Sequence, residues 1–196
     1  MPHKNNLVDI LDGCKKGVAE SQRELYELLY EYTLKICRRY TAEREDALEI
    51  MHDGFIKIFR KIGGFTYPLN TDELTYAFRS WVKKIMTYTA IDHQRKNRNH
   101  FLQGGGYQEI EGTTKSTTMY YTDNFGYSEL IGMVRQLPLS YRWVFNLYVI
   151  DGYSHKEIAA LLKISESTSR SNLAKAKEHL RQMLKKTNEE VHAKNN

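Results

Sequence analysis

The chain has 196 residues, of which 41% are hydrophobic and 27% charged, as in an ordinary globular protein of one or two small domains. Its 29 Lys and Arg exceed its 24 Asp and Glu, and the net charge of +5 favours a polyanionic partner. No apolar run approaches the ~20 residues of a membrane span, and the N-terminus lacks the layout of a secretory signal, so we expect a cytoplasmic protein without membrane insertion.

Helical periods fill the first half of the chain. Apolar residues recur at spacings of three and four over residues 25–36 and again over residues 48–62. The segment that follows, to about residue 76, contains Pro and Asn and predicts a loop. A third helix is predicted over residues 78–98, and we expect its Trp81 to lie in the core.

A second helical part follows an aperiodic segment. Gly, Ser and Thr dominate residues 103–128, which predicts a flexible linker. Residues 187–196 are expected to form a frayed tail. The sequence therefore predicts an all-α protein with two small helical domains, 1–102 and 129–186, joined by the linker, with a helix-turn-helix in the second domain.

The helix-turn-helix rests on caps and on one apolar stripe. Ser154 and Glu157 form a capping box before a short helix, and Ser165 is suited to cap a second helix that runs at least to Leu180. One face of that second helix is expected to be buried and carries Ser169, Leu173, Ala176 and Leu180. The residues that point away are Ser167, Ser171, Asn172 and Lys175. A braced helix with small polar and cationic side chains is typical of proteins that read the DNA major groove.

Charge is distributed unevenly along the chain. Residues 43–53 contain five acids and one base, a net charge of −4. Residues 76–101 contain six bases and one acid, and residues 163–186 contain seven bases and two acids, so each has a net charge of +5. Cationic side chains bind DNA phosphates because each contact releases counterions. The two basic segments therefore predict two DNA contacts, and the acidic helix predicts a basic protein partner.

These fragments, in this order, resemble the sigma-70 family of bacterial RNA polymerase initiation factors, in its extracytoplasmic-function (ECF) branch. The resemblance rests on residues 46–55, 57–62, 78–85, 90–96, 137–145 and 152–180. It covers nearly the whole chain except the linker and the tail. It implies two helical domains, called regions 2 and 4, in a non-enzymatic subunit that directs promoter-specific initiation and assists DNA melting.

The resemblance assigns a role to each charged surface. Docking on the clamp helices of core RNA polymerase falls to Asp46, Glu49, His52 and Asp53. Recognition and melting of the −10 element fall to Arg79, Lys83, Lys84, Tyr88, Arg95 and Lys96. Recognition of the −35 element falls to Ser167, Arg170, Ser171, Asn172 and Lys175. The implied partners are core RNA polymerase, promoter DNA and, because relatives are commonly held inactive by one, an anti-sigma factor.

The chain departs from the family pattern at three places. Tyr88 stands where many relatives have an Asn that binds a flipped −10 base, and Tyr lacks the paired donor and acceptor of an amide. The interval 65–78 is several residues longer than usual. Ser169 replaces a residue that is more often Val, so we expect that face of the helix to pack less deeply.

Other residues do not indicate catalysis or metal binding. Cys14 and Cys37 lack a Cys-x-x-Cys spacing, which favours small buried side chains over a disulfide or a zinc site. His52, His93 and His155 have no partner at ligand spacing on their own helical face. We expect no catalytic residue, no metal and no cofactor. Two other functions stay open: a stand-alone DNA-binding regulator with an N-terminal dimerisation domain, and a nucleic-acid enzyme such as a recombinase.

Overall fold

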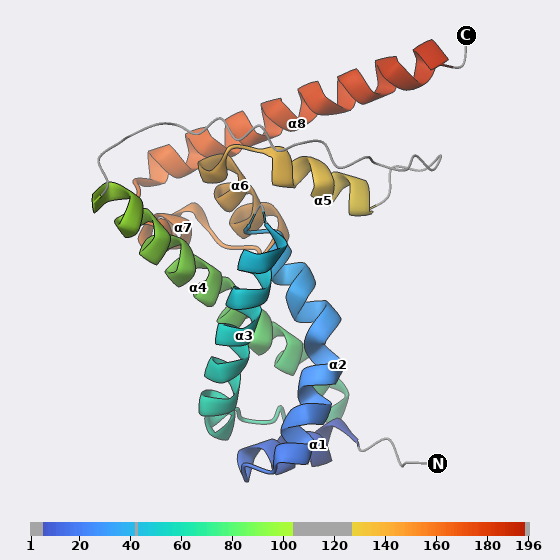
Figure 1. The fold of residues 1–196 in the computed structure, drawn as a ribbon, viewed down its shortest axis with the longest axis vertical. Coiled ribbons are helices and arrows are strands. Elements are labelled where there is room, and N and C mark those ends of the chain that lie inside the picture. The colour runs from blue at the N-terminus through green and yellow to red at the C-terminus, as the bar shows by residue number, and fades with distance from the viewer. Residues whose placement is uncertain (1–5, 42, 104–126, 195–196) are drawn as a thin grey trace. The chain divides into compact units, whose positions relative to one another are not determined.

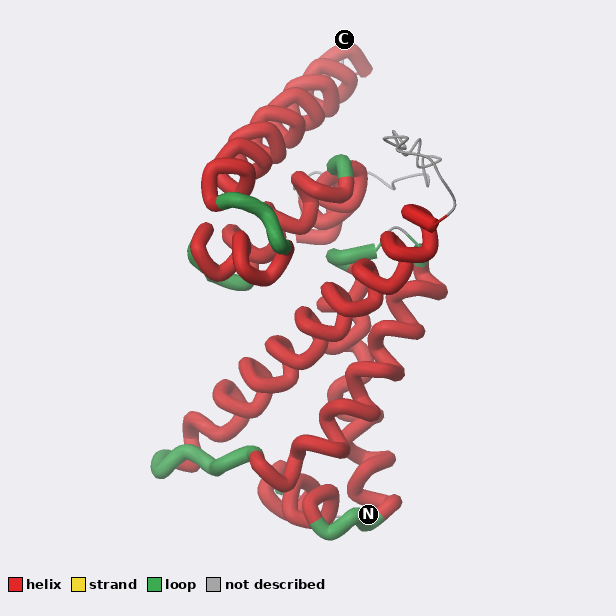
Figure 2. The backbone as a smooth tube through the Cα atoms, turned by 90° about the vertical axis from the view of Figure 1, so that its left-hand side faces the viewer, coloured by secondary structure: helices red, strands yellow, loops and turns green. Residues whose placement is uncertain are grey.

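The computed structural model describes three stretches of the chain, residues 6–41, 43–103 and 127–194. It divides into two compact units, Met1–Gly104 and Gly105–Asn196. Across the described stretches every regular element is a helix (Figure 2). The predicted all-α fold is confirmed. The expected linker, 103–128, lies outside the described residues except at its two ends, so its flexibility stays a prediction.

The first unit is a bundle of helices with two short 3-10 turns. Its elements are α1 (Leu7–Lys15), α2 (Ala19–Arg38), α3 (Arg44–Lys61), η1 (Ile62–Gly64), η2 (Thr71–Glu73) and α4 (Leu74–Gln103). Helices α2, α3 and α4 pack against one another, and α1 packs on α2 (Figure 1). The core is formed by apolar residues at spacings of three and four, among them Leu25, Leu29, Ile50, Met51, Ile58, Phe78, Val82 and Met86.

Helices α3 and α4 approach closely at Gly54. A Cβ atom at this position would overlap the sulfur of Met86, whose side chain is fully buried. Gly63, beyond the end of α3, has nothing within 4 Å of the corresponding position. Because protein interiors are close-packed, the missing side chain at Gly54 is what allows the two helices to touch. This contact fixes the acidic helix α3 against the basic helix α4.

The segment between η1 and α4 packs against the unit at its start and is exposed at its tip. Phe65 is buried, and the Tyr67 hydroxyl donates a hydrogen bond to Asp12 of α1. Burial and this hydrogen bond raise the pKa of Tyr67 well above its ordinary value. Leu69 at the tip is fully exposed. The loop is shorter than predicted because α4 begins at Leu74, where that side chain enters the core.

Trp81 differs from its predicted place in the core. It is half-buried, and its ring packs on Phe65 and Phe78 with centroids 5.3 and 5.7 Å apart. The deeply buried stripe of α4 passes through Phe78 and Val82. Trp81 directly precedes Val82 and is therefore rotated away from the centre of this stripe. Trp81 therefore covers the edge of the core and holds Phe65 in place.

The second unit contains the helix-turn-helix. Its elements are α5 (Tyr127–Gln136), α6 (Leu139–Phe145), a π-helical turn η3 (Asn146–Ile150), α7 (His155–Leu162) and α8 (Glu166–Lys194). Helices α6 and α7 pack against α8. The tail that we expected to fray after residue 186 is instead a continuation of α8 to Lys194, where the helix extends past α6 and α7 (Figure 1).

Ser169 corrects the expectation of shallow packing. Its side chain is fully buried, and its Oγ lies 2.9 Å from Nδ1 of His155. The hydroxyl therefore has a hydrogen-bond partner inside the helix pair, which removes the usual cost of burying a polar group. The His155 ring also stacks on Tyr148, with centroids 4.4 Å apart. His155 thus connects α7, η3 and α8.

The two cysteines are free and buried, as predicted. Burial, with a smaller effect of the Glu24 charge, raises the pKa of the Cys14 thiol to about 11. Burial raises the pKa of Cys37 to about 12. Both thiols are therefore protonated at neutral pH and pack as small apolar groups.

Candidate nucleic-acid interface

Serine caps fix the geometry of the turn between α7 and α8. The Glu157 amide donates to Oγ of Ser154 at 3.3 Å, and the Ser154 amide donates to the Glu157 carboxylate at 2.8 Å. Helix α7 ends at Lys163, whose φ of 55° places it in the left-handed region. The Thr168 amide then donates to Oγ of Ser165 at 3.0 Å. Both predicted caps are confirmed, and together they set where α8 begins.

Helix α8 buries one stripe and turns its polar residues outward, as predicted. The buried residues are Ser169, Leu173, Ala176 and Leu180. Ser167, Arg170, Ser171 and Lys175 are exposed, and Asn172 is half-buried. Ser167 Oγ lies 2.8 Å from Ser165 Oγ, so this hydroxyl interacts with the cap of the helix. The first two turns of the exposed face therefore present the small hydroxyl side chains of Ser167 and Ser171.

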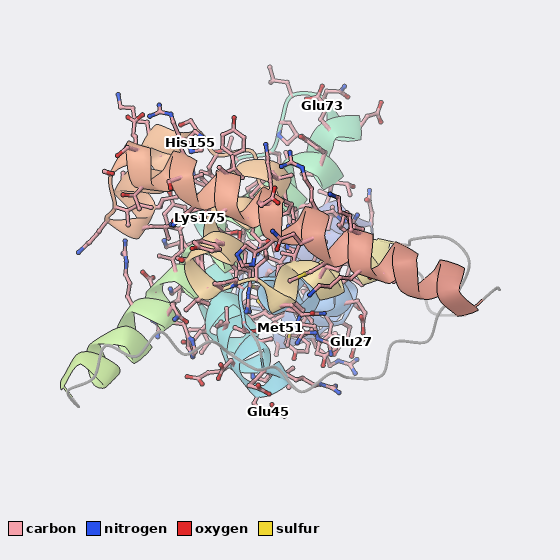
Figure 3. All side chains as sticks on the ribbon, turned by 90° about the horizontal axis from the view of Figure 1, so that it is seen from above. Glu27, Glu45, Met51, Glu73, His155 and Lys175 are labelled. Carbon is pink, nitrogen blue, oxygen red and sulfur yellow. The ribbon has the colours of Figure 1, made fainter. Side chains whose placement is uncertain are left out.

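Two cations flank these hydroxyls and are held in different ways. The Lys175 ammonium lies 5.7 Å from the centroid of the Tyr141 ring on α6, within cation–π range (Figure 3 labels Lys175). The Arg170 guanidinium donates to the Glu166 carboxylate at 2.9 Å, one turn earlier on α8. Exposed pairs of this kind contribute little stability, so a phosphate competes easily for Arg170.

A second basic row extends the Arg170 flank along α8. Arg170, Lys177 and Arg181 border a hollow of about 260 Å³ together with Leu173 and Ala174. Sequence reasoning did not assign Lys177 or Arg181, although their spacings of seven and eleven from Arg170 place all three on one flank of a helix. The cationic flank of α8 therefore extends further along the helix than the predicted residues.

The basic residues of α4 lie on two flanks and do not form one face. Arg79 and Lys83, one turn apart, border a hollow beside α2. Lys84 and Tyr88, also one turn apart, are both exposed. Consecutive residues of an α-helix are rotated by ~100°, so Lys84 points away from the flank of Lys83. Arg79 and Lys83 thus lie on one flank of α4 and Lys84 and Tyr88 on another, although the sequence analysis gave all four the same role.

Arg95 and Lys96 lie three turns further along α4. Arg95 Nη1 is 3.9 Å from the Asp92 carboxylate, which also accepts a hydrogen bond from Lys57 of α3 at 3.0 Å. Lys96 is exposed. Sequence reasoning missed the ion pair of Asp92 with Lys57, because 35 residues separate its partners and no motif marks it. This pair connects the basic helix to the acidic helix near the DNA candidates.

The predicted acidic surface lies along one side of α3. Asp46, Glu49 and Asp53 are three and four residues apart, with Glu49 exposed and the other two half-buried. The Glu49 carboxylate lies 3.5 Å from Nε2 of His93 on α4. This contact crosses between helices, so it was invisible to a search for partners on one helical face.

His52 and an unpredicted apolar residue complete this surface. Nε2 of His52 lies 3.3 Å from the Tyr26 hydroxyl of α2. Ile56, one turn beyond His52, is 49% exposed. The sequence pattern did not single out Ile56, because an apolar residue in an amphipathic helix is ordinarily expected in the core. An acidic surface with an exposed Ile at its end is suited to a partner that offers both cations and an apolar contact.

A buried arginine organises the start of α6. Arg142 is 6% exposed, and its Nε and Nη2 donate to the Leu137 carbonyl at 3.3 and 3.1 Å. Burial, with a smaller effect of Arg135, lowers the pKa of Arg142 to about 10. Arg142 therefore stays charged at neutral pH and fixes the turn before α6, which carries Tyr141 beneath Lys175.

The described part of the chain holds no cluster of three His, Cys, Asp or Glu side chains that could bind a metal ion. The three histidines named from the sequence each have a different neighbour: Tyr26 for His52, Glu49 for His93 and Ser169 for His155. In the same described stretches, every helix is too short or too polar to span a bilayer.

Both units match known protein families. The model of Sigma-70 region 2 matches residues 25–100, and the model of Sigma-70, region 4 matches residues 119–180. ECF RNA polymerase sigma factor SigW of Bacillus subtilis is 26% identical over 185 residues, which are 87% of this chain and 92% of that protein. ECF RNA polymerase sigma factor SigE of Mycolicibacterium smegmatis is 24% identical over 170 residues, which are 84% of this chain and 63% of that protein.

A solved structure of the sigma factor RpoE in complex with the anti-sigma factor NepR from Bartonella quintana aligns over 83% of this chain and 96% of that one, with a TM-score of 0.49 and 16% identity. The two family matches fall on the two units in chain order, and the ECF relatives extend along most of the chain. The chain therefore belongs to the sigma-70 family as an ECF sigma factor, a class that binds RNA polymerase and directs promoter-specific transcription initiation.

Proposed function

We propose that this sigma factor binds core RNA polymerase through α3, reads the −10 element and assists melting through α4, and reads the −35 element through α8. In this proposal residues 1–102 act as region 2 and residues 129–186 as region 4, with 103–128 as the tether between them. The protein acts in the cytoplasm, where the chromosome and the polymerase are, and it uses no cofactor of its own.

The observation that carries the proposal is the polar face of α8. The buried stripe leaves Ser167 and Ser171 outward between the cations Arg170 and Lys175. Small hydroxyls allow close approach to base edges, and flanking cations reach either phosphates or guanine acceptors, each good base contact being worth ~1–3 kcal/mol. Asn172, at the half-buried edge, is suited to a base-edge or phosphate contact. This pattern supports major-groove recognition.

Helix α4 supports a role at the −10 element. Arg79 and Lys83 on one flank and Lys84 and Tyr88 on another offer cations and a ring to a strand that leaves the duplex. Arg95 and Lys96 extend the positive charge along the helix. A single basic face suffices for a phosphate contact, whereas two flanks suit a DNA strand that wraps the helix.

The acidic side of α3 supports binding to the clamp helices of core polymerase. Asp46, Glu49 and Asp53 would be repelled by DNA phosphates, so this surface requires a different, basic partner. His52 and the exposed Ile56 add an imidazole and an apolar contact to the same surface. A stand-alone regulator has no need for such a surface beside a basic helix, which is why we place that function second and a recombinase third.

Transcription with purified components tests the proposal. The chain is mixed with core polymerase and a promoter library, and the initiated transcripts are sequenced. We expect transcripts that start downstream of a shared pair of elements and that depend on the added chain. Active core enzyme without specific initiation, together with tight binding of a palindrome by the chain alone, would instead support the stand-alone regulator.

A further inference from the structure

Helix α1 contacts the long segment between η1 and α4 through Tyr67. The Tyr67 hydroxyl donates a hydrogen bond to the Asp12 carboxylate, and the Lys15 ammonium lies 3.7 Å from the centroid of the Tyr67 ring. Asp12 and Lys15 are three residues apart and therefore share one face of α1. One of them binds the polar end of the tyrosine and the other binds the face of its ring.

This polar face of α1 is not what attaches the helix to the first unit. Ile10, Leu11 and Cys14 are buried on a different flank, and α1 packs on α2. Burial of these apolar side chains contributes more to the attachment than one hydrogen bond does. The contact with Tyr67 therefore has a different consequence, which is to fix the segment that contains this tyrosine.

The far end of the same segment is held by a turn. The Asn70 side-chain oxygen accepts a hydrogen bond from the Asp72 amide, and the Asn70 carbonyl accepts one from the Glu73 amide, both at 3.1 Å. These bonds begin η2, which continues directly into α4. Pro68 and Leu69 are the two residues between the tyrosine and this turn, and the ring of Pro68 fixes one of their backbone angles.

Contacts at both ends fix the place of an exposed side chain. Leu69 lies at the apex of the segment and is fully exposed. A free loop would lose conformational entropy when such a side chain met another molecule, whereas a segment that is held at both ends has lost part of this entropy already. Release of Tyr67 would restore that cost and let the apex take up several positions.

Tyr67 is also connected to α4 through packed aromatic rings. The ring centroids of Tyr67 and Phe65 are 6.0 Å apart, and Phe65 packs on Phe78 and Trp81 with centroids 5.2 and 5.3 Å apart. Phe65 and Phe78 are buried, and a close-packed interior does not absorb a shift of a neighbouring ring without moving. The position of Tyr67 therefore affects the first turns of α4.

We infer that Asp12 and Lys15 of α1, acting through Tyr67, position the segment 65–73 and the first turns of α4 for discrimination among −10 sequences. The inference deepens the proposed function and rests on it for the role of α4 at the −10 element. Tyr67 is a positioning residue, because it acts through the segment and need not touch DNA. Helix α1 thereby takes part in promoter selection, although it carries none of the residues assigned to DNA or to polymerase.

The test uses the full-length chain, core polymerase and a promoter library with a fixed −35 element and a randomised −10 element. Sequencing of the transcripts gives the −10 preference, which is the use of the best −10 sequence relative to its single-base variants. Tyr67→Phe keeps the ring and removes the hydrogen bond, so the −10 preference should fall about twofold to tenfold. Asp12→Ala should give the same loss, and Tyr67→Phe should add nothing to it.

Two further variants separate the parts of the contact. Asp12→Asn keeps an oxygen that accepts the hydrogen bond, so it should retain the −10 preference of the unmodified chain. Lys15→Met removes the cation from the ring and should lower the −10 preference about twofold. Tyr148→Phe is the matched control, because it removes the same hydroxyl from an exposed tyrosine of the second unit, and it should change nothing.

Two other measurements distinguish positioning from a general loss of structure. Affinity for labelled core polymerase should stay within about twofold of the unmodified chain in every variant, since the contact is worth no more than one hydrogen bond. Without polymerase, hydrogen exchange should be faster for the backbone amides of residues 65–73 in Tyr67→Phe and unchanged for those of residues 47–58.

An unchanged −10 preference in Tyr67→Phe overturns the inference. So does a loss of −10 preference that is matched by a loss of core affinity, or equal hydrogen exchange of residues 65–73 with and without the Tyr67 hydroxyl. These results leave the proposed function in place, because the unmodified chain still initiates at specific promoters. An unmodified chain that never initiates with active core enzyme removes the proposed function and this inference with it.

Discussion

The two basic helices, α4 and α8, carry similar charge but differ in what stands between their cations. On α8, Arg170 and Lys175 flank the small hydroxyls of Ser167 and Ser171 on an exposed helix face. On α4, Arg79 borders a hollow that two tyrosine rings also line. Hydroxyls suit close approach to paired base edges, whereas open rings suit unpaired bases. The same net charge therefore stands in two different chemical settings, among hydroxyls on α8 and among aromatic rings on α4.

The largest effect is expected from removing both cations of α8. The double variant Arg170→Ala, Lys175→Ala should reduce initiation from promoters with a −35 element about 100-fold, because each contact is worth ~1–3 kcal/mol. Initiation rates on promoters with and without that element measure the loss. Affinity for core polymerase should not change, and Lys156→Ala, an exposed lysine of α7, is the matched control. A loss of core affinity would contradict the division between the two units.

Charge reversal on α3 should lower affinity for core polymerase and leave recognition of the −35 element unchanged. Asp46→Lys with Asp53→Lys should weaken core binding about tenfold or more, since like charges then face the basic partner, and the effect should shrink at high salt. Binding of labelled core polymerase at two salt concentrations measures it. Glu31→Lys, on the exposed side of α2, controls for net charge. Unchanged core affinity in the double variant would remove α3 as the docking surface.

The packing of α3 against α4 in the first unit can be tested by adding one methyl group at Gly54. Gly54→Ala should destabilise the unit by ~1–3 kcal/mol, because its methyl group would overlap the Met86 sulfur and force that buried side chain, or the two helices, to shift. For a domain of about 100 residues this lowers the melting temperature by ~5–15 °C. Gly63→Ala, with nothing within 4 Å of the new methyl group, should melt like the unmodified chain. Equal melting of the two variants would contradict the close approach.

A smaller loss of stability is expected in the second unit when the contact between Ser169 and His155 in the helix-turn-helix is removed. Ser169→Ala removes the hydrogen bond with His155 and should destabilise the unit by ~0.5–1.5 kcal/mol. Urea unfolding followed by circular dichroism measures this, with Ser140→Ala on the exposed side of α6 as the control. If Ser169→Ala were as stable as the control, the contact between α7 and α8 would rest on apolar packing alone.

The smallest change is expected from freeing Arg170. Glu166→Gln removes the carboxylate that holds the guanidinium, and it removes a negative charge from the first turn of α8. Pairs at this spacing are worth ~0.2–0.5 kcal/mol, so duplex affinity should rise by no more than about twofold. Anisotropy with a labelled promoter duplex detects the gain. A weaker complex would mean that Glu166 itself accepts a hydrogen bond from the DNA.

Local rules predicted the second unit better than the first. The caps at Ser154 and Ser165 and the buried stripe through Leu173 follow from residue types within a few positions, and all are confirmed. The contacts that sequence missed join residues far apart in the chain, such as Lys57 with Asp92. No local pattern encodes which helices become neighbours, so such pairs appear only in the folded unit.

The errors have the same origin. Trp81 was expected in the core because it follows the apolar period of the helix, yet the deeply buried stripe runs through Phe78 and Val82 and leaves Trp81 at its edge. Ser169 was expected to weaken packing because it replaces a residue that is more often Val, but it is fully buried and its hydroxyl is paired with His155 of the preceding helix. The hollow beside Tyr32 and Tyr76 needs two helices to form, and the single sequence gave no signal that these rings share a site.

Because Met86 packs closely against Gly54, its oxidation can show when α3 and α4 of the first unit separate. Met86 is fully buried, so peroxide reaches its thioether only when α3 and α4 separate. Oxidation would place a polar oxygen on a side chain that packs closely against Gly54, so the oxidised bundle should close less tightly. The rate of Met86 oxidation, read by mass spectrometry, therefore reports how often the bundle opens.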